Sequence, residues 1–206
     1  MSFDEKAVQA GIRHIRRRDP ILGEVIRSVG AFTLKPRKQG YEILVRSILS
    51  QQISTSAAST IRNRLQALLP GRRIVPQSLD ALSDEQLQQV GISTQKRTYL
   101  RDLTRCTLDG SISFKRIRKA SDEEAIEELI QVKGIGRWTA QMYLIFSLGR
   151  MDVFAPDDLG LRNAVDRLYD IPDQAPRKHY DELAMNWSPY RSIASWYLWR
   201  SLEKKD

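Results

Sequence analysis

Two adjacent acidic residues stand out as a group that could do chemistry. Asp157 and Asp158 follow Pro156 and precede a segment with helical spacing, so the pattern predicts a helix to about Tyr169 with a carboxylate at its N-terminus. The helix dipole favours an ionised carboxylate there. Such a group can stabilise a developing positive charge or orient an attacking water. For an isolated Pro-Asp-Asp, plain helix capping is the simpler explanation.

A second candidate is the glycine-rich segment 132–136, Val-Lys-Gly-Ile-Gly, between two predicted helices. Glycines let the backbone turn tightly and expose its N–H groups, which also begin the following helix. These groups can hold a phosphate without any side chain, and such a contact does not depend on base sequence. Lys133 adds a cation nearby. An ordinary helical hairpin with closely packed glycines is the alternative.

The composition limits the class of protein. The 206 residues include 33 Lys+Arg and 25 Asp+Glu, a net charge of +8 that favours a polyanionic partner. No apolar run approaches the roughly 18 residues of a membrane helix. Cys106 is the single cysteine, and with only His14 and His179 besides, a structural zinc site or a cysteine-ligated cluster is not expected. A reducing compartment fits this cysteine content.

The elements that position these groups are helical. Apolar residues recur at three- and four-residue spacing, and strand-like alternation is nearly absent. Ser83 and Ser121 each begin a capping box. Helices are expected at about 3–17, 20–29, 41–50, 54–69, 83–90, 94–108, 121–131, 137–148, 159–169, 177–186 and 189–203.

Longer strings are more specific than these separate signals. Residues 129–140, Leu-Ile-Gln-Val-Lys-Gly-Ile-Gly-Arg-Trp-Thr-Ala, resemble the hairpin of the helix-hairpin-helix DNA glycosylase superfamily, which includes endonuclease III and 3-methyladenine DNA glycosylase II. The loop 152–158 then places Asp158 in the catalytic position, 20 residues after Trp138, as in the alkylation-repair branch. Residues 50–54 and 187–192 also resemble that branch, and the resemblance covers roughly 20–203.

The resemblance implies an all-α, two-lobed helix-hairpin-helix glycosylase fold with the active site in the cleft between the lobes. One unit of residues 1–206 is expected, with a central lobe at about 35–150 that carries the hairpin. A second lobe would combine about 1–34 with 151–206. The chain resembles the compact form of the branch, without the additional N-terminal domain of the larger relative.

Departures from the family narrow the expected reaction. Bifunctional members carry a lysine where this chain has Trp138, so an amine nucleophile is missing and base removal without strand cleavage is implied. The four-cysteine cluster of endonuclease III-like members is also absent from the sequence. The intercalating wedge of the larger relative is apolar, whereas the matching position here is Gln52; Gln52 or Ile53 could serve.

A flipped base needs flat aromatic walls, and the resemblance places Trp199 at the pocket-tryptophan position. Trp138, Tyr143 and Trp196 are further candidates, although for Tyr143 and Trp196 core packing is the alternative. An alkylated purine is positively charged and can stack on indole faces by cation–π attraction. It is already a good leaving group, so no general acid is required beside it.

The hairpin residues expected at the DNA phosphates are Lys133, Gly134, Ile135, Gly136 and Arg137. The resemblance also implies a monovalent cation at the hairpin, held by the backbone carbonyls of Ile130, Val132 and Ile135. No cofactor is expected to be required.

The sequence therefore predicts a monofunctional glycosylase that flips and excises alkylated purines, of the 3-methyladenine and 7-methylguanine type, from double-stranded DNA. Two alternatives stay open: a glycosylase of the same fold for another damaged base, and a DNA-binding module without chemistry. Asp158 at the family spacing argues against the second. The protein is expected to be monomeric, without a membrane partner, and cytoplasmic at the nucleoid, or nuclear in a eukaryote.

Overall fold

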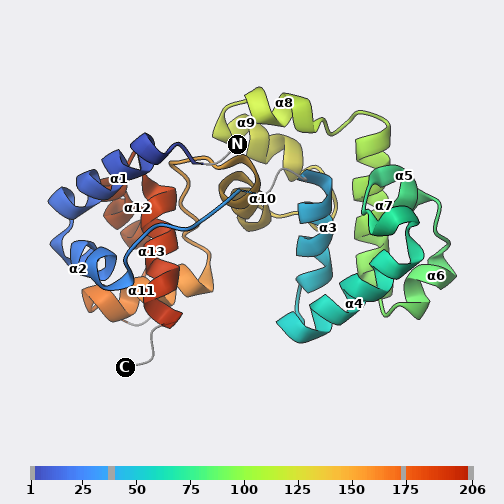
Figure 1. The fold of residues 1–206 in the computed structure, drawn as a ribbon, viewed down its shortest axis with the longest axis horizontal. Coiled ribbons are helices and arrows are strands. Elements are labelled where there is room, and N and C mark those ends of the chain that lie inside the picture. Colours follow the sequence, from blue (N-terminus) through green and yellow to red (C-terminus); the bar gives the residue numbers. More distant parts are fainter. Residues whose placement is uncertain (1–2, 37–39, 173–174, 204–206) are drawn as a thin grey trace. The chain divides into compact units, whose positions relative to one another are not determined.

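The computed structural model describes residues 3–36, 40–172 and 175–203 (Figure 1). Helices and loops make up this described part, which contains no strand, and the all-α fold class is confirmed. The chain divides into two compact units. Unit 1 comprises Met1–Pro36 and Leu144–Asp206, and unit 2 comprises Arg37–Tyr143. No helix of the described residues is long and apolar enough to cross a membrane.

Unit 1 joins the first two helices to the C-terminal ones. Its elements are α1 (Glu5–Arg18), α2 (Pro20–Val29), a π-helical segment η2 (Leu144–Leu148), α11 (Leu159–Tyr169), α12 (Arg177–Ala184), η3 (Met185–Trp187) and α13 (Arg191–Glu203). Each predicted helix in this set is confirmed to within a few residues.

Unit 2 contains the remaining helices. Its elements are α3 (Gly40–Ser50), α4 (Thr55–Leu68), η1 (Pro70–Arg72), α5 (Pro76–Asp80), α6 (Asp84–Gln89), α7 (Thr94–Leu108), α8 (Phe114–Lys119), α9 (Asp122–Leu129) and α10 (Arg137–Tyr143). The sequence analysis missed the short helices α5 and α8. Each is only five or six residues long and therefore shows little periodicity.

Local capping explains where the predicted helices begin. At the start of α9 the hydroxyl of Ser121 accepts the Glu124 N–H, and the Glu124 carboxylate accepts the Ser121 N–H in return. Ser83 and Gln86 make the same reciprocal pair before α6. Both capping boxes are therefore confirmed.

The predicted continuous α-helix over 137–148 is wrong in its second half. The chain is α-helical to Tyr143, and the next five residues form η2, which ends before Gly149 in the left-handed region at φ +68°. A π turn inserts a residue and so changes which side chains face the neighbouring helices. The two compact units meet at 143/144, and Phe146 of η2 packs on Trp199 within unit 1.

A buried carboxylate connects the elements of unit 1. Asp19 is 5% exposed and caps α2 by accepting the Leu22 N–H at 2.9 Å. It also accepts hydrogen bonds from the indole of Trp187, at 2.7 Å, and from the hydroxyl of Tyr169. These hydrogen bonds offset the free-energy cost of burying the Asp19 carboxylate. They also connect α1 and α2 to α11 and η3.

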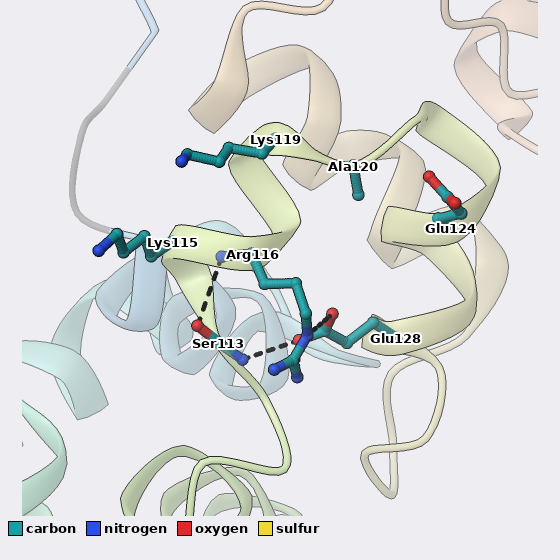
Figure 2. A pocket seen from close by; sticks show the side chains of 7 residues that line it. All are labelled: Ser113, Lys115, Arg116, Lys119, Ala120, Glu124 and Glu128. Carbon is teal, nitrogen blue, oxygen red and sulfur yellow. Dashed lines mark hydrogen bonds and ion pairs between the residues drawn. The ribbon is translucent and has the colours of Figure 1, made fainter.

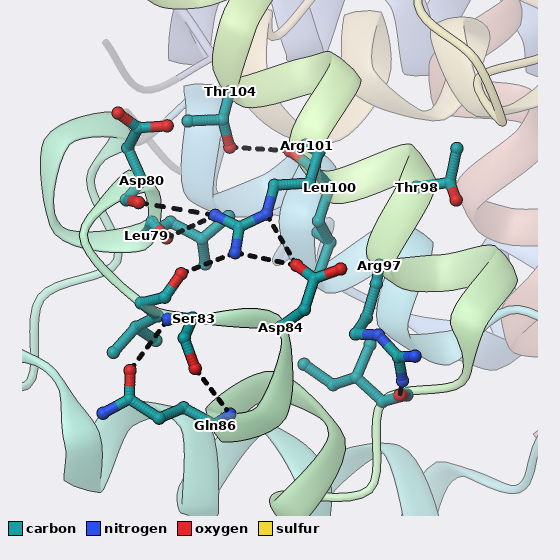
Figure 3. A network of polar contacts seen from close by, with 12 residues as sticks. Leu79, Asp80, Ser83, Asp84, Gln86, Arg97, Thr98, Leu100, Arg101 and Thr104 are labelled. Carbon is teal, nitrogen blue, oxygen red and sulfur yellow. Dashed lines mark hydrogen bonds and ion pairs between the residues drawn. The ribbon is translucent and has the colours of Figure 1, made fainter.

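An arginine organises unit 2 in a comparable way (Figure 3). Arg101 of α7 donates to the carboxylate of Asp84 at 2.9 Å and to the carbonyls of Leu79 and Asp80 at 3.4 Å. It also donates to the Leu82 carbonyl. Its planar fork thus satisfies the end of α5 and the turn before α6. This clamp fixes α7, the helix on which the hairpin packs.

Candidate functional site

Asp158 is the N-cap of α11 and is partly exposed. Its Oδ1 accepts the Leu161 N–H at 2.8 Å and the indole Nε1–H of Trp199 at 2.9 Å. Two donors on one carboxylate oxygen hold the group in one orientation. Tertiary structure therefore brings two sequence-predicted site residues together, with the edge of the indole directed at the carboxylate.

Trp199 is itself held from two sides. Its ring stacks on Phe146 of η2, with ring centroids 5.5 Å apart and planes at 27°. A Cβ added at Gly160 would lie 3.2 Å from Trp199 Cδ1 and 3.1 Å from Asp158 Oδ1. The absence of a side chain at position 160 therefore leaves the space that the Trp199–Asp158 contact occupies.

The loop that leads to Asp158 is anchored to α13. Arg191 donates to Asp152 through Nε at 2.8 Å and through Nη2 at 3.0 Å, and Ser192 Oγ accepts the Val153 N–H at 3.0 Å. Burial raises the pKa of Asp152, but the hydrogen bonds and charge of Arg191 lower it more, so the pKa lies below its ordinary value. An ionised Asp152 thus fixes the start of the loop against α13, the helix that carries Trp199.

Asp157 has different surroundings from its neighbour. It is exposed, and its carboxylate pairs with Arg177 at 3.1 Å and with Arg162 at 3.9 Å. Ion pairs of this exposed kind contribute little stability. Asp157 is therefore a matched control for Asp158: the same residue type at the adjacent position, committed to surface arginines.

The hairpin in unit 2 is closed by its first glycine. Gly134 has φ +82°, in the left-handed region that favours glycine, and a Cβ there would lie 2.2 Å from the ring of Tyr99. Gly136 differs, because a Cβ at that position would meet nothing within 4 Å. One glycine is thus required by the fold, whereas the other leaves open space in front of the backbone.

Partners within unit 2 occupy some of the hairpin N–H groups. Lys133 N–H donates to Asp102 Oδ2 of α7 at 2.9 Å, and Ile135 N–H donates to the Val132 carbonyl at 3.0 Å. For Gly134 and Gly136 the described residues supply no acceptor. These two glycine amides are therefore candidate donors to a phosphate, beside the ammonium group of Lys133.

The carboxylate under the hairpin is held ionised. Burial raises the pKa of Asp102, but the hydrogen bonds from Lys133 N–H and the guanidinium of Arg105 lower it more, so the pKa falls below its ordinary value. An ionised Asp102 is the stronger acceptor. The hairpin backbone at Lys133 is thereby fixed on α7.

The two wedge candidates lie in the turn between α3 and α4. Gln52 is exposed and adopts φ +56°, a conformation that is uncommon for a residue with a side chain, and Ile53 is 37% exposed. The preceding residue, Gln51, donates through Nε2 to the Gly134 carbonyl at 2.8 Å. This hydrogen bond joins the turn directly to the hairpin within unit 2.

Two further side chains of the hairpin region, Arg137 and Trp138, differ in their surroundings. Arg137 makes a bidentate pair with Glu123 of α9, with both N–O distances at 2.6 Å, and its hydrogen bond lowers the pKa of Glu123. A phosphate would have to compete with this pair. Trp138, in the first turn of α10, is 42% exposed, unusually high for a tryptophan.

The other two aromatic candidates are buried. Tyr143 is 2% exposed and packs against Phe114 at the end of α10, and Trp196 is 7% exposed against Phe32 and Tyr197. Their burial favours the alternative of core packing over that of a pocket wall. In this respect they differ from Trp138, which presents its ring to solvent.

The carbonyl set expected for a cation is chemically suited to one. Ile130, Val132 and Ile135 would offer neutral carbonyl oxygens, which are hard ligands fitting an alkali ion. Within the described residues, no cluster of three or more His, Cys, Asp or Glu side chains could hold a metal ion. The cation at the hairpin stays a prediction.

The first helix of the hairpin is braced by α8 (Figure 2). Arg116 makes two hydrogen bonds to the Glu128 carboxylate, at 2.7 and 2.8 Å, and the Ser113 N–H donates to the same group at 2.8 Å. A cavity of about 590 Å³ lies beside this clamp, between α8 and α9. Its lining mixes lysines with the carboxylates of Glu124 and Glu128.

Sequence reasoning missed the residues that orient the site. These are Gln51 and Tyr99 around the hairpin, Asp102 beneath it, and Phe146 and Gly160 beside Trp199. Gln51 belongs to a string that already resembles the family, so its position was a signal. The other four carry none, because their contacts join segments far apart in the sequence.

Comparison with known proteins shows which family this chain is similar to. The family model described as "HhH-GPD superfamily base excision DNA repair protein" matches residues 45–189. The chain is 36% identical over 172 residues to DNA-3-methyladenine glycosylase 1 of Schizosaccharomyces pombe, covering 82% of this chain and 75% of that protein.

Solved structures are similar along nearly the whole chain. The DNA-3-methyladenine glycosidase of Bacillus halodurans superposes with a TM-score of 0.86 at 34% identity, over 98% of this chain and 91% of that one. A 3-methyladenine DNA glycosylase of Schizosaccharomyces pombe in complex with abasic DNA gives a TM-score of 0.84 at 31% identity, over 95% and 97%.

Proposed function

The chain belongs to the HhH-GPD superfamily of base excision DNA repair proteins, and on that premise we propose that it is a monofunctional DNA glycosylase for alkylated purines. The observation that carries the proposal is the Asp158 carboxylate, held at the N-terminus of α11 by Leu161 N–H and Trp199 Nε1–H. Relatives named for 3-methyladenine support the substrate class.

Asp158 stabilises the transition state of N-glycosidic cleavage. The bond from C1′ to the base breaks with its electron pair going to the base, and the sugar becomes oxocarbenium-like. At about 4 Å and an effective dielectric of about 20, a carboxylate stabilises such a charge by about 4 kcal/mol. This corresponds to a rate factor on the order of a thousand. Water then adds its oxygen to C1′, and its proton passes to the carboxylate or to solvent.

The substrate's own charge makes a general acid unnecessary. A purine alkylated at N3 or N7 is cationic in DNA and leaves as a neutral base. The ring of Trp199, which is hydrogen-bonded to Asp158 within unit 1, is the proposed stacking partner of that base. Cation–π attraction to an indole is worth about 0.5–2 kcal/mol and favours the cationic base over an unmodified one.

The hairpin holds the DNA backbone. The amides of Gly134 and Gly136 bind a phosphate, with Lys133 adding charge, and the turn at Gln52 enters the space that the flipped nucleotide leaves. Gln51 keeps turn and hairpin in register through the Gly134 carbonyl. A monovalent cation on the carbonyls of Ile130, Val132 and Ile135 would stabilise the same turn.

The product is an intact strand with an abasic site. Trp138 stands where bifunctional relatives keep a lysine, so no side-chain amine forms a Schiff base with the sugar. The protein acts as a monomer. Sedimentation of the protein with and without an abasic duplex tests that stoichiometry.

A base-release assay tests the function. Duplex DNA treated with a methylating agent is incubated with the protein, and the released bases are separated by chromatography, with untreated duplex as the control. Release of 3-methyladenine and 7-methylguanine is expected from the treated DNA alone. Release of only deaminated or oxidised bases from suitably damaged duplexes would assign another lesion, and release of no base would identify a binding module.

A further inference from the structure

Unit 1 carries a cavity of about 490 Å³ along one face of α1. Its lining residues are Ala10, Arg13, His14 and Arg17 of α1, and Tyr190 just before α13. Each of the four α1 residues lies three or four positions from two of the others, so they share one face of the helix. None of them belongs to the candidate active site or to the hairpin.

The charge of this cavity is unbalanced. Arg13 and Arg17 stand one helical turn apart, and neither has an ion pair or side-chain hydrogen bond with any described residue. No acidic side chain is among the lining residues. Two like charges at this spacing repel each other. An anion between the two guanidinium forks would relieve that repulsion and match their geometry.

The wall of the cavity is preformed. The ring of His14 packs on Tyr190 with centroids 5.5 Å apart and planes at 57°. Tyr190 is fixed through its N–H, which donates to the Trp187 carbonyl at 2.7 Å, and through Arg191, which is held by Asp152. The cavity is thus built on the same anchored segment that positions the loop of the active site.

His14 adds an unsatisfied polar atom. Its Nε2 is buried and finds no hydrogen-bond partner among the described residues. A buried polar group without a partner costs free energy, so native proteins nearly always satisfy it. A water or a ligand held in the cavity would satisfy it here.

The larger cavity between α8 and α9 makes a useful contrast. Glu124 and Glu128 line it, and its arginine, Arg116, is already committed to Glu128 (Figure 2). Carboxylates there would repel an anion, whereas the α1 cavity has cations without carboxylates. Both linings have an excess of positive charge, but only the α1 cavity has arginines without a carboxylate partner.

We propose that the α1 cavity binds a phosphate group, with Arg13 and Arg17 as its donors and His14 and Tyr190 as its wall. The phosphate belongs either to the backbone of a bound DNA or to a free nucleotide, and the recognition chemistry is the same. The proposal goes beyond the proposed function, because it requires neither base flipping nor bond cleavage.

The test compares two doubly substituted proteins of equal charge. Arg13→Gln/Arg17→Gln removes the cavity donors, and Arg16→Gln/Arg18→Gln removes two exposed arginines of the same helix that do not line the cavity. Thermal unfolding checks that both variants remain folded. If Arg13→Gln/Arg17→Gln does not fold, Arg13→Lys/Arg17→Lys replaces it, because this variant keeps the charge but removes the guanidinium groups. All are titrated with inorganic phosphate and deoxyadenosine monophosphate, followed through the His14 ring resonances, and with undamaged duplex at several salt concentrations.

Two results support the proposal and separate the sources. If the phosphate is that of DNA, the negative slope of log affinity against log salt becomes shallower in the cavity variant, by about 0.9 for each lost phosphate contact. In the control variant the slope changes less. If it is that of a nucleotide, the small ligands shift the His14 resonances in the wild type and the control but not in the cavity variant. The proposal is overturned if the small ligands leave His14 unmoved and the two glutamine variants share one salt slope. Base release is measured in a separate assay. The phosphate-binding result can therefore be interpreted even if the protein shows no glycosylase activity.

Discussion

The indole N–H of Trp199 donates to the same oxygen of Asp158, at 2.9 Å, that caps α11 through the Leu161 N–H. The carboxylate therefore has two fixed donors from two helices, and its orientation depends on α13 as well as on its own loop. Hydrogen bonds to a charged group contribute about 1.5–3 kcal/mol each. The tryptophan expected to face the base thus also orients the carboxylate that we propose as catalytic.

Replacing Asp158 tests its role in the transition state. Asp158→Asn keeps an acceptor for the cap but removes the charge, so single-turnover base release should fall by about a hundredfold or more while lesion binding stays close to normal. Asp157→Asn, whose carboxylate faces Arg177 and Arg162, should have a much smaller effect. Normal turnover by Asp158→Asn, or greater sensitivity at Asp157, would contradict the assignment.

Trp199→Phe tests the hydrogen bond from Trp199 to Asp158 separately from the stacking of Trp199 on Phe146. Phenylalanine keeps an aromatic ring against Phe146 but has no N–H for Asp158. The rate of the chemical step should fall about tenfold, which corresponds to the loss of about 1.4 kcal/mol of orientation. The control is Trp196→Phe, a buried tryptophan without a contact to Asp158, which should change stability more than rate. Equal loss of rate in both variants would assign Trp199 to packing alone.

The wild-type protein should leave its product strand unbroken. With Trp138 in the lysine position, borohydride should trap no covalent protein–DNA adduct, and strand breaks should appear only after alkali treatment. Denaturing electrophoresis of an end-labelled duplex measures both. A nick without alkali, or a trapped adduct, would mean that another amine acts as the nucleophile.

The two hairpin glycines should differ when replaced. Gly134→Ala forces a side chain into the left-handed region, at a cost of about 1–3 kcal/mol, and into the ring of Tyr99. It should therefore lower both the melting temperature and DNA affinity. Gly136→Ala meets no atom within 4 Å and should fold normally.

Both glycine variants should bind DNA more weakly than the wild type. For each variant the loss of affinity should be the same for damaged and undamaged duplex, because the lost contacts are to backbone phosphates. Fluorescence anisotropy with the two duplexes measures this. Unchanged affinity of a folded Gly136→Ala protein would remove the hairpin from the interface.

Asp102 should make stability depend on pH in the acidic range. Its folded pKa lies below the ordinary value of 3.8, so its contribution is present above that pH and is lost as the pH falls through the folded pKa. Asp102→Asn should be less stable than the wild type at neutral pH, with the gap closing below about pH 3.8. Urea unfolding of both proteins across this range is the measurement, and a constant gap would contradict an ionised Asp102 under the hairpin.

Local patterns sufficed for much of the architecture. Apolar periodicity, the two serine capping boxes and Asp19-Pro20 predicted most helices, because caps and helix faces are decided by residues three or four positions apart. The string over 129–140 and the spacing to Asp158 were enough for the family. Short helices such as α5 and the π turn after Tyr143 escaped, since neither leaves a periodic signal.

What the sequence by itself determined is therefore the inventory of the site: a carboxylate at a helix start, a glycine hairpin and a set of aromatic rings. Only the tertiary structure decided how they are used. It buried Tyr143 and Trp196, left Trp138 exposed, and directed Trp199 at Asp158. The physical reason is that hydrogen bonds between distant segments, such as those of Trp199 and Gln51, depend on packing, which no local periodicity encodes.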